Sequence, residues 1–341
     1  MLFQNIQGQE PAVAALRNAL ERDRLAHAYL FIGPGGVGKK KTALTLAQAI
    51  FCREKSKEGC GTCPACVSVR ASTHPDLTLV APESGKQSVV IEQMRELQHL
   101  FILKPVLGDR KIAVLDDAHL LTPQAQSALL KLVEEPPGQA LLILLTVNSA
   151  TLSRPLLSRC QQVRFSALPS AVVEQLLVQE HGKDVATARA LALHSRGSIG
   201  RALLLNPEMF TEERKYVEAA LPTLQNASFS DASRLAEWLV ADRVKKSAAA
   251  AEGGEGRSTG DRLELVLSWY EEVMRCAVFG QPGVVRHQEC LPAVSQMAIE
   301  LGVAGALRQL TLVYDTIQAL GRNANRQLAV EDMLLQLAAA P

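Results

Sequence analysis

A glycine-rich loop followed by lysines is the first feature of this sequence whose residue types suit chemistry. Glycines let the backbone curl so that several N–H groups point inward, and a helix that begins there adds partial positive charge. The loop follows a predicted strand at residues 28–32 and opens a predicted helix. That is the setting of a phosphate-binding loop, and a glycine turn without a ligand is the alternative. The candidate nucleotide-binding residues of this loop are Gly33, Gly35, Gly36, Gly38, Lys39 and Lys40.

Lys40 stands where a phosphate-binding loop normally has Ser or Thr, whose hydroxyl binds Mg²⁺. A lysine has no acceptor lone pair and brings a second ammonium to the place of a dication. Thr42 is two residues further along the predicted helix, about 200° around it, so its hydroxyl is expected to point away from the site. We therefore expect no Mg²⁺ and no metal-dependent hydrolysis. ATP binding in which Lys39 and Lys40 neutralise the phosphates stays open.

An acidic pair, Asp116 and Asp117, ends the predicted strand at residues 111–117. In a nucleotide site Asp116 would orient a metal through water. Asp117 takes the place of the glutamate that usually positions the attacking water, and it is one methylene shorter. A displacement of about 1 Å can cost roughly a hundredfold in rate. We assign both residues to a degenerate nucleotide site; a strand-end turn in which an aspartate caps the next helix is the alternative.

Four cysteines lie within 15 residues, and Gly61 and Pro64 between them allow tight turns. Their spacing lets the thiolates converge on one tetrahedral ion, and no carboxylate or histidine interrupts them. The pattern predicts a closed structural Zn²⁺ site that fastens a segment without a core of its own. Reduced cysteines used only for packing are the alternative. The candidate metal ligands are Cys52, Cys60, Cys63 and Cys66.

Composition excludes several classes of protein. The chain has 341 residues, 48% of them hydrophobic, with a formal net charge of +1, so it does not coat nucleic acid by bulk charge. Aromatic residues make up only 4%, which argues against a stacking platform for single strands. No stretch approaches the roughly 20 apolar residues needed to cross a bilayer. The N-terminal segment lacks a secretory signal pattern, so we expect a cytoplasmic protein without a membrane partner.

Predicted strands and helices alternate over the first 165 residues, which indicates an α/β domain with a parallel sheet covered on both faces. From about residue 169 only helices are predicted, including 170–180, 185–194 and one from 198 onward. A Gly/Ala/Ser-rich segment at about 246–261 is expected to be a flexible loop, and Trp238 and Trp269 are expected in a helical core. The strands are expected at 28–32, 76–80, 111–117 and 140–147, and the helices between them at 10–22, 42–51, 91–103 and 123–134.

The order of the motifs resembles that of bacterial clamp-loader proteins in the AAA+ superfamily. The phosphate loop and the cysteine cluster are followed by DDAH (116–119), LLKLVEEPP (129–137) and SRC (158–160). The similarity covers most of residues 1–205. It implies an AAA+ P-loop parallel-sheet domain at 1–167 with a zinc module at 52–66, a small helical lid at 168–206 and a C-terminal all-α collar at 207–341. It independently implies zinc at the cysteines.

The resemblance also implies a role and partners. In that family five subunits, among them gamma/tau and delta, form an open ring that uses ATP to open the sliding clamp and place it on primed DNA. The ring is part of the DNA polymerase III holoenzyme. Arg159 of SRC then matches the arginine finger that acts in trans at the ATP of the neighbouring subunit, because a permanent planar cation suits developing phosphoryl charge. An ordinary surface arginine is the alternative.

The start of the lid helps to choose between subunits. ATPase members carry Gly-Ser-x-Arg there, whereas here Ser198 and Ile199 are followed by Gly200, with Arg201 one place late. A slip of one residue turns a helical side chain by about 100°. Together with Lys40 and Asp117, this departure favours a non-hydrolysing stator subunit. An active gamma/tau-like ATPase subunit is the first alternative, and an unrelated P-loop kinase is the second.

Overall fold

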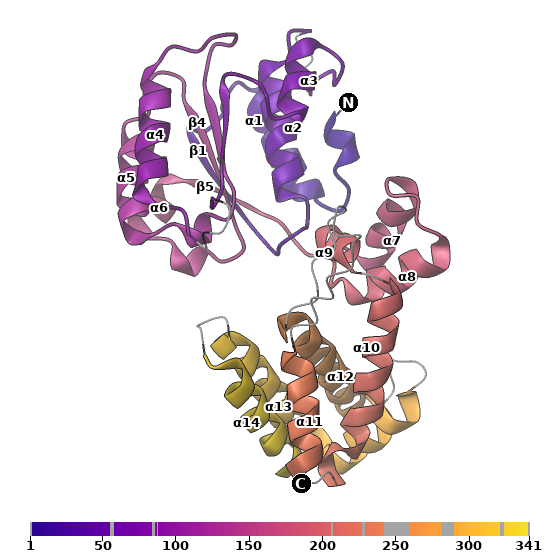
Figure 1. The fold of residues 1–341 in the computed structure, drawn as a ribbon. Coiled ribbons are helices and arrows are strands. Elements are labelled where there is room, and N and C mark those ends of the chain that lie inside the picture. The colour runs from indigo at the N-terminus through magenta and orange to yellow at the C-terminus, as the bar shows by residue number, and fades with distance from the viewer. Residues whose placement is uncertain are drawn as a thin grey trace, which may run out of the picture. The chain divides into compact units, whose positions relative to one another are not determined.

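The chain divides into two compact units, Met1–Leu203 and Leu204–Pro341 (Figure 1). The three lid helices expected at 168–206 fall in the first unit, except for the last residue of the third. The structure is a computed structural model that describes residues 2–54, 58–83, 86, 88–205, 207–226, 229–241, 259–280, 290–320 and 324–339.

A five-stranded parallel sheet forms the centre of the first unit, in the order β2-β3-β4-β1-β5. The central strands are buried on both faces, as short apolar runs in a parallel sheet require. The predicted α/β class with a parallel sheet is confirmed. The strands are β1 (Ala28–Ile32), β2 (Leu77–Val80), β3 (Ile112–Leu115), β4 (Leu141–Thr146) and β5 (Gln161–Arg164).

Helices cover both faces of this sheet and bury two separate apolar cores against it (Figure 1). One core joins the sheet to α1 (Glu10–Glu21), α2 (Lys39–Phe51) and α3 (Pro64–Arg70). The other joins it to α4 (Ile91–Ile102), α5 (Pro123–Glu134) and α6 (Arg154–Arg159). Packing on both faces of the sheet therefore fixes the positions of its strands. The phosphate loop follows the carboxyl end of β1, and the acidic pair follows the carboxyl end of β3.

The expectation that strands end at residue 147 is wrong, because β5 follows α6 at the edge of the sheet. Three of the four β5 side chains are exposed and only Val163 is buried, so the segment QQVR carries no apolar pattern. The short helices α3 and α6 were not predicted either. Each begins with a proline in its first turn, Pro64 or Pro155, a position where the missing N–H costs nothing.

Three helices follow the sheet, as predicted: α7 (Ser170–Gln179), α8 (Val185–His194) and α9 (Ile199–Leu204). The α7 and α8 helices pack against one another. Asp184 begins α8 by accepting a hydrogen bond from the Thr187 N–H at 2.9 Å. The described part of this segment is helical, as the lid prediction requires.

The second unit is helical throughout its described residues. It contains α10 (Pro207–Ala220), the 3₁₀ segment η4 (Leu221–Asn226), α11 (Phe229–Val240), α12 (Thr259–Phe279), α13 (Leu291–Leu320) and α14 (Arg326–Ala339). Among the described residues of the chain, no helix is long and apolar enough to cross a membrane.

A buried arginine ties three of these helices together. Arg262 on α12 pairs with Glu213 of α10 at 3.1 Å and donates to the Trp238 and Ala241 carbonyls at the end of α11. Trp269 is fully buried as predicted, whereas Trp238 is only half-buried and lies beneath the Arg262 guanidinium. Most of the predicted flexible loop, 246–258, lies outside the described residues. Its last part, 259–261, begins α12, so the loop prediction is wrong there.

Candidate functional site

The phosphate loop joins β1 to α2, and its two central glycines adopt backbone conformations that suit glycine. Gly36 has φ 68° and Gly38, the residue before α2, has φ 99°. Lys39 is buried, and its ammonium donates to the Gly33 and Pro34 carbonyls, at 2.6 Å each. Burial lowers the pKa of Lys39, while the nearby carboxylates of the acidic pair raise it. Lys39 is therefore folded back onto its own loop.

Lys40 forms an ion pair with Asp116, with 3.1 Å between Nζ and Oδ2. Asp116 follows the end of β3, so the structure brings the acidic pair to the loop as the sequence predicted. The ammonium thus takes up the carboxylate that would otherwise orient a metal. Thr42 is no substitute, because its buried hydroxyl donates to the Gly38 carbonyl at 2.9 Å. This donor set does not fit Mg²⁺, which requires oxygen ligands.

The start of the lid lies directly on the phosphate loop. The Gly200 N–H donates to the Gly36 carbonyl at 3.1 Å. A Cβ added at Gly200 would lie 2.9 Å from the Gly36 Cα, and one added at Gly36 would lie 2.3 Å from the Ser198 Oγ. A second link joins α2 to the residue after α7, because the Lys41 ammonium pairs with the Glu180 carboxylate at 3.0 Å. The sequence drew attention to Gly200 because ATPase members have an arginine at that position, but it did not predict this contact.

A cavity of about 520 Å³ lies beside the loop. Its polar side includes the three lysines at 39–41 and the acidic pair, and its apolar side includes Ile6, Leu168, Leu176 and Leu203. This volume is in the usual range for small-molecule sites, about 300–1,000 Å³. This arrangement suits a ligand with an anionic group at one end and a less polar group at the other. Each of the three lysines, however, already has a partner within this chain.

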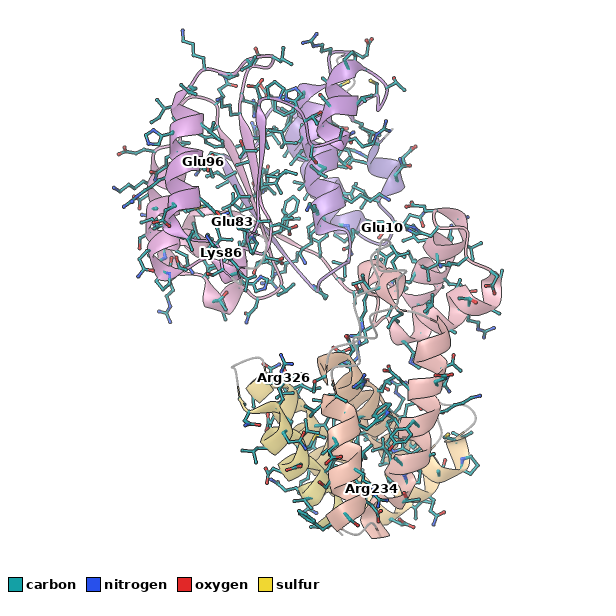
Figure 2. All side chains as sticks on the ribbon, in the orientation of Figure 1. Glu10, Glu83, Lys86, Glu96, Arg234 and Arg326 are labelled. Atoms are coloured by element: carbon teal, nitrogen blue, oxygen red, sulfur yellow. The ribbon has the colours of Figure 1, made fainter. Side chains whose placement is uncertain are left out.

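Gln9 is a positioning residue for the loop that the sequence did not single out. Its buried amide donates to the Ser166 carbonyl at 2.7 Å and to the Val37 carbonyl at 3.3 Å, and it accepts from the Ser166 N–H at 3.1 Å. The amide therefore fastens the loop to the segment after β5. Glu10, labelled in Figure 2, accepts from the Gly8 N–H and orders the turn before α1. A polar residue before a helix is too common a signal to have revealed this role.

The four predicted metal ligands converge. Their sulfur atoms lie within 4.8 Å of one another, although Cys52 follows α2 while Cys66 lies in α3. Backbone N–H groups, first that of Cys63, lower the pKa of Cys60 to about 6, whereas burial raises the pKa of Cys66 to about 12. Four cysteine sulfurs at this separation fit a tetrahedral Zn²⁺, which would hold them as thiolates and tie α2 to α3.

Arg159 is the last residue of α6, and its side chain is 41% exposed. Its guanidinium pairs with the Glu134 carboxylate at 2.9 Å and donates to the Pro155 carbonyl at 3.1 Å. The residues that line the cavity, all in the described part of the chain, do not include Arg159. The next residue, Cys160, is buried in the core.

Comparison with known proteins identifies relatives of this chain. Residues 8–169 match the family described as DNA polymerase III, delta subunit. The chain is 28% identical to the DNA polymerase III subunit delta' of Bacillus subtilis, over 96% of both proteins. It is 33% identical to the delta' subunit of Pseudomonas aeruginosa, over 63% of this chain and 66% of that protein. It is 34% identical to the tau/gamma subunit of Haemophilus influenzae, over 60% of this chain and 30% of that protein.

A parallel sheet with a phosphate loop after β1, an acidic pair after β3 and a helical lid on the loop defines an AAA+ protein. With these relatives, the chain is a member of the clamp-loader family of that superfamily. Within the family it resembles the DNA polymerase III delta' subunit over nearly its whole length. Its relatives also include the tau/gamma subunit of Haemophilus influenzae, of which the match covers 30%.

Removal of one cluster cysteine tests the metal site. We expect reduced protein to carry about one Zn²⁺ per chain and Cys60→Ser to lose most of it, because a structural site needs all four ligands. Metal analysis after gel filtration measures the content, and the thermal midpoint is expected to fall with it. Cys290→Ser, outside the cluster, is the control. A content below about half an equivalent in the unaltered protein contradicts the assignment.

Gly200→Ala tests the contact between lid and loop. The added methyl would lie 2.9 Å from the Gly36 Cα, so one backbone segment must move, at an expected cost of about 1–3 kcal/mol. Faster amide hydrogen exchange at residues 197–203 would report the separation. Gly35→Ala is the matched control, since its nearest neighbour would be the Val147 Cγ1 at 3.9 Å. Equal exchange in the two variants would show that the contact does not hold the lid.

Proposed function

We propose that this chain is the non-hydrolysing stator subunit of a DNA polymerase III clamp loader. In this role it occupies a five-membered ring with gamma/tau and delta subunits and helps to load the sliding clamp on primed DNA. The observation that carries the proposal is the Lys40–Asp116 ion pair. It places an ammonium, in place of a hydroxyl and a metal ion, at the point where ATP hydrolysis needs a dication.

Two further features support the absence of hydrolysis. Asp117 has a left-handed backbone, with φ 49°, and an exposed side chain, so its short carboxylate is not held against the loop. Gly200 supplies no cation to the phosphates, and its backbone packs on Gly36 instead. A nucleotide in the cavity would have to displace lysine contacts and would find no metal ligand set. Binding of ATP without Mg²⁺ remains compatible with the cavity.

We propose that Arg159 acts on a neighbouring subunit and not on its own chain. Its guanidinium is exposed, permanently charged and absent from the lining of the chain's own cavity. These properties suit an arginine finger that acts at the ATP of the adjacent subunit. The proposal includes a sheet domain at 1–167, a lid at 168–206 and a collar at 207–341, with Zn²⁺ on the four cysteines as a structural ion.

An active gamma/tau-like ATPase subunit is the second candidate. It is favoured by the 34% identity to the tau/gamma subunit of Haemophilus influenzae and by the complete glycine loop with Lys39. Lys40, Asp117 and Gly200 oppose it for the reasons given above. Turnover by the purified chain separates the two candidates.

The purified chain alone is expected to show no Mg²⁺-dependent ATP turnover above a blank. The reason is that its loop has an ammonium where the metal-binding hydroxyl belongs. Phosphate release at saturating ATP, with and without Mg²⁺, is the measurement, and a gamma/tau preparation serves as the positive control. Steady Mg²⁺-dependent hydrolysis by this chain, removed by Lys39→Ala, would establish the second candidate instead.

Arg159→Ala is expected to leave the chain folded and to slow ATP hydrolysis in the reconstituted ring. At the ATP site of the adjacent subunit, the rate of hydrolysis should fall by about 10³–10⁵-fold, as for other arginine fingers. The cleanest assay uses a ring in which only the adjacent subunit can hydrolyse ATP. Arg154→Ala, an exposed arginine at the other end of α6, is the matched control. Equal rates for the two variants would remove Arg159 from the mechanism.

A further inference from the structure

The Arg159 side chain, at the end of α6, is oriented by contacts of its guanidinium with two groups of the same chain. The Glu134 Oε1 forms an ion pair with Nη2 at 2.9 Å, and the Pro155 carbonyl accepts a hydrogen bond from Nη1 at 3.1 Å. A third, longer contact joins Nη1 to the Ser158 hydroxyl at 3.5 Å. A guanidinium has five N–H donors, so these contacts leave donors for a phosphoryl group. The arginine is oriented and still able to bind.

Both sides of this contact are fixed by the core. Glu134 ends α5 directly after Leu132 and Val133, which are buried, and it precedes two prolines. Arg159 ends α6 between the fully buried Leu156 and the buried Cys160. The α5 and α6 helices pack against each other. The distance between the two backbones is therefore set by packing, and the ion pair only has to select the side-chain rotamer.

Selection of that rotamer matters for an arginine that acts on another subunit. A free arginine side chain has considerable rotamer entropy, which is lost when the side chain is immobilised. A group that is already oriented acts on developing charge without that cost. The carboxylate of Glu134 meets only one part of the guanidinium, so it orients the group without occupying all of its donors.

We propose that Glu134 is a positioning residue for Arg159: it holds the guanidinium ready for the phosphates of the neighbouring subunit's nucleotide. This inference rests on the proposed function, since it assigns a second residue to the same trans site. The adjacent Glu135 offers a comparison within the chain. It is also exposed, one residue further along and after the end of α5, and its carboxylate makes no hydrogen bond or ion pair with Arg159 in the described structure.

The test is a double-mutant cycle in a reconstituted ring in which only the adjacent subunit hydrolyses ATP. Glu134→Ala is expected to lower kcat by about three- to fivefold, the upper range for an exposed ion pair, with KM unchanged. In the Arg159→Ala background the same substitution should have no further effect. Glu134→Gln, which keeps an acceptor oxygen without the charge, should recover part of the loss. Glu135→Ala is the matched control.

Each result decides between the explanations. A loss from Glu134→Ala that is equal with and without Arg159, or accompanied by a lower thermal midpoint of the chain, would mean a structural role and overturn the proposal. A rate equal to that of Glu135→Ala would overturn it as well, and the finger would stand if Arg159→Ala still slows the ring. No effect of Arg159→Ala would defeat the proposed function and this inference together.

Discussion

The ion pair between Lys40 and Asp116 is the interaction on which the character of this site depends. In a working phosphate loop the corresponding positions supply a hydroxyl and a carboxylate to one dication, and that ion binds the nucleotide. Here a single positive charge, covalently attached to α2, satisfies the carboxylate at 3.1 Å. Mg²⁺ would have to compete with the Lys40 ammonium for this carboxylate, and it would gain no hydroxyl ligand in return. The chain therefore pairs the Asp116 carboxylate with one of its own side chains and not with a diffusible ion.

The contact between the lid and the phosphate loop is likewise made by the chain's own groups. A hydrolysing subunit needs a lid whose position responds to the phosphates. In this chain Gly200 meets the loop through its backbone, with a hydrogen bond from Gly200 to Gly36 and no room for a methyl group between them. Lys41 and Glu180 add an exposed ion pair, which contributes little by itself. The contacts of the lid are thus made within the chain and require no ligand.

Much of this architecture was predictable because it depends on local pattern. Apolar runs gave four of the five strands, and the spacing of glycine, lysine, aspartate and cysteine gave the loop, the acidic pair and the cluster. The edge strand β5 was missed because its pairing with β1 stabilises it, and its own side chains are mostly polar. The contacts Gln9–Ser166, Gly200–Gly36 and Glu134–Arg159 join residues 157, 164 and 25 positions apart in the sequence. Long-range contacts of this kind leave no periodic signal in a single sequence.

The candidate phosphate site and Arg159, the proposed arginine finger, have different structural requirements, and they lie on different elements. Hydrolysis needs oxygen ligands on α2 and β3 and a responsive lid, so on the proposed function several coordinated changes separate this chain from activity. Replacement of Lys40 alone would restore a hydroxyl but leave Asp117 one methylene short and Gly200 packed on the loop. An arginine finger needs only an exposed guanidinium on a rigid helix end, which α5 and α6 provide through their packing on the opposite core. The first set of features can therefore be lost while the second remains intact.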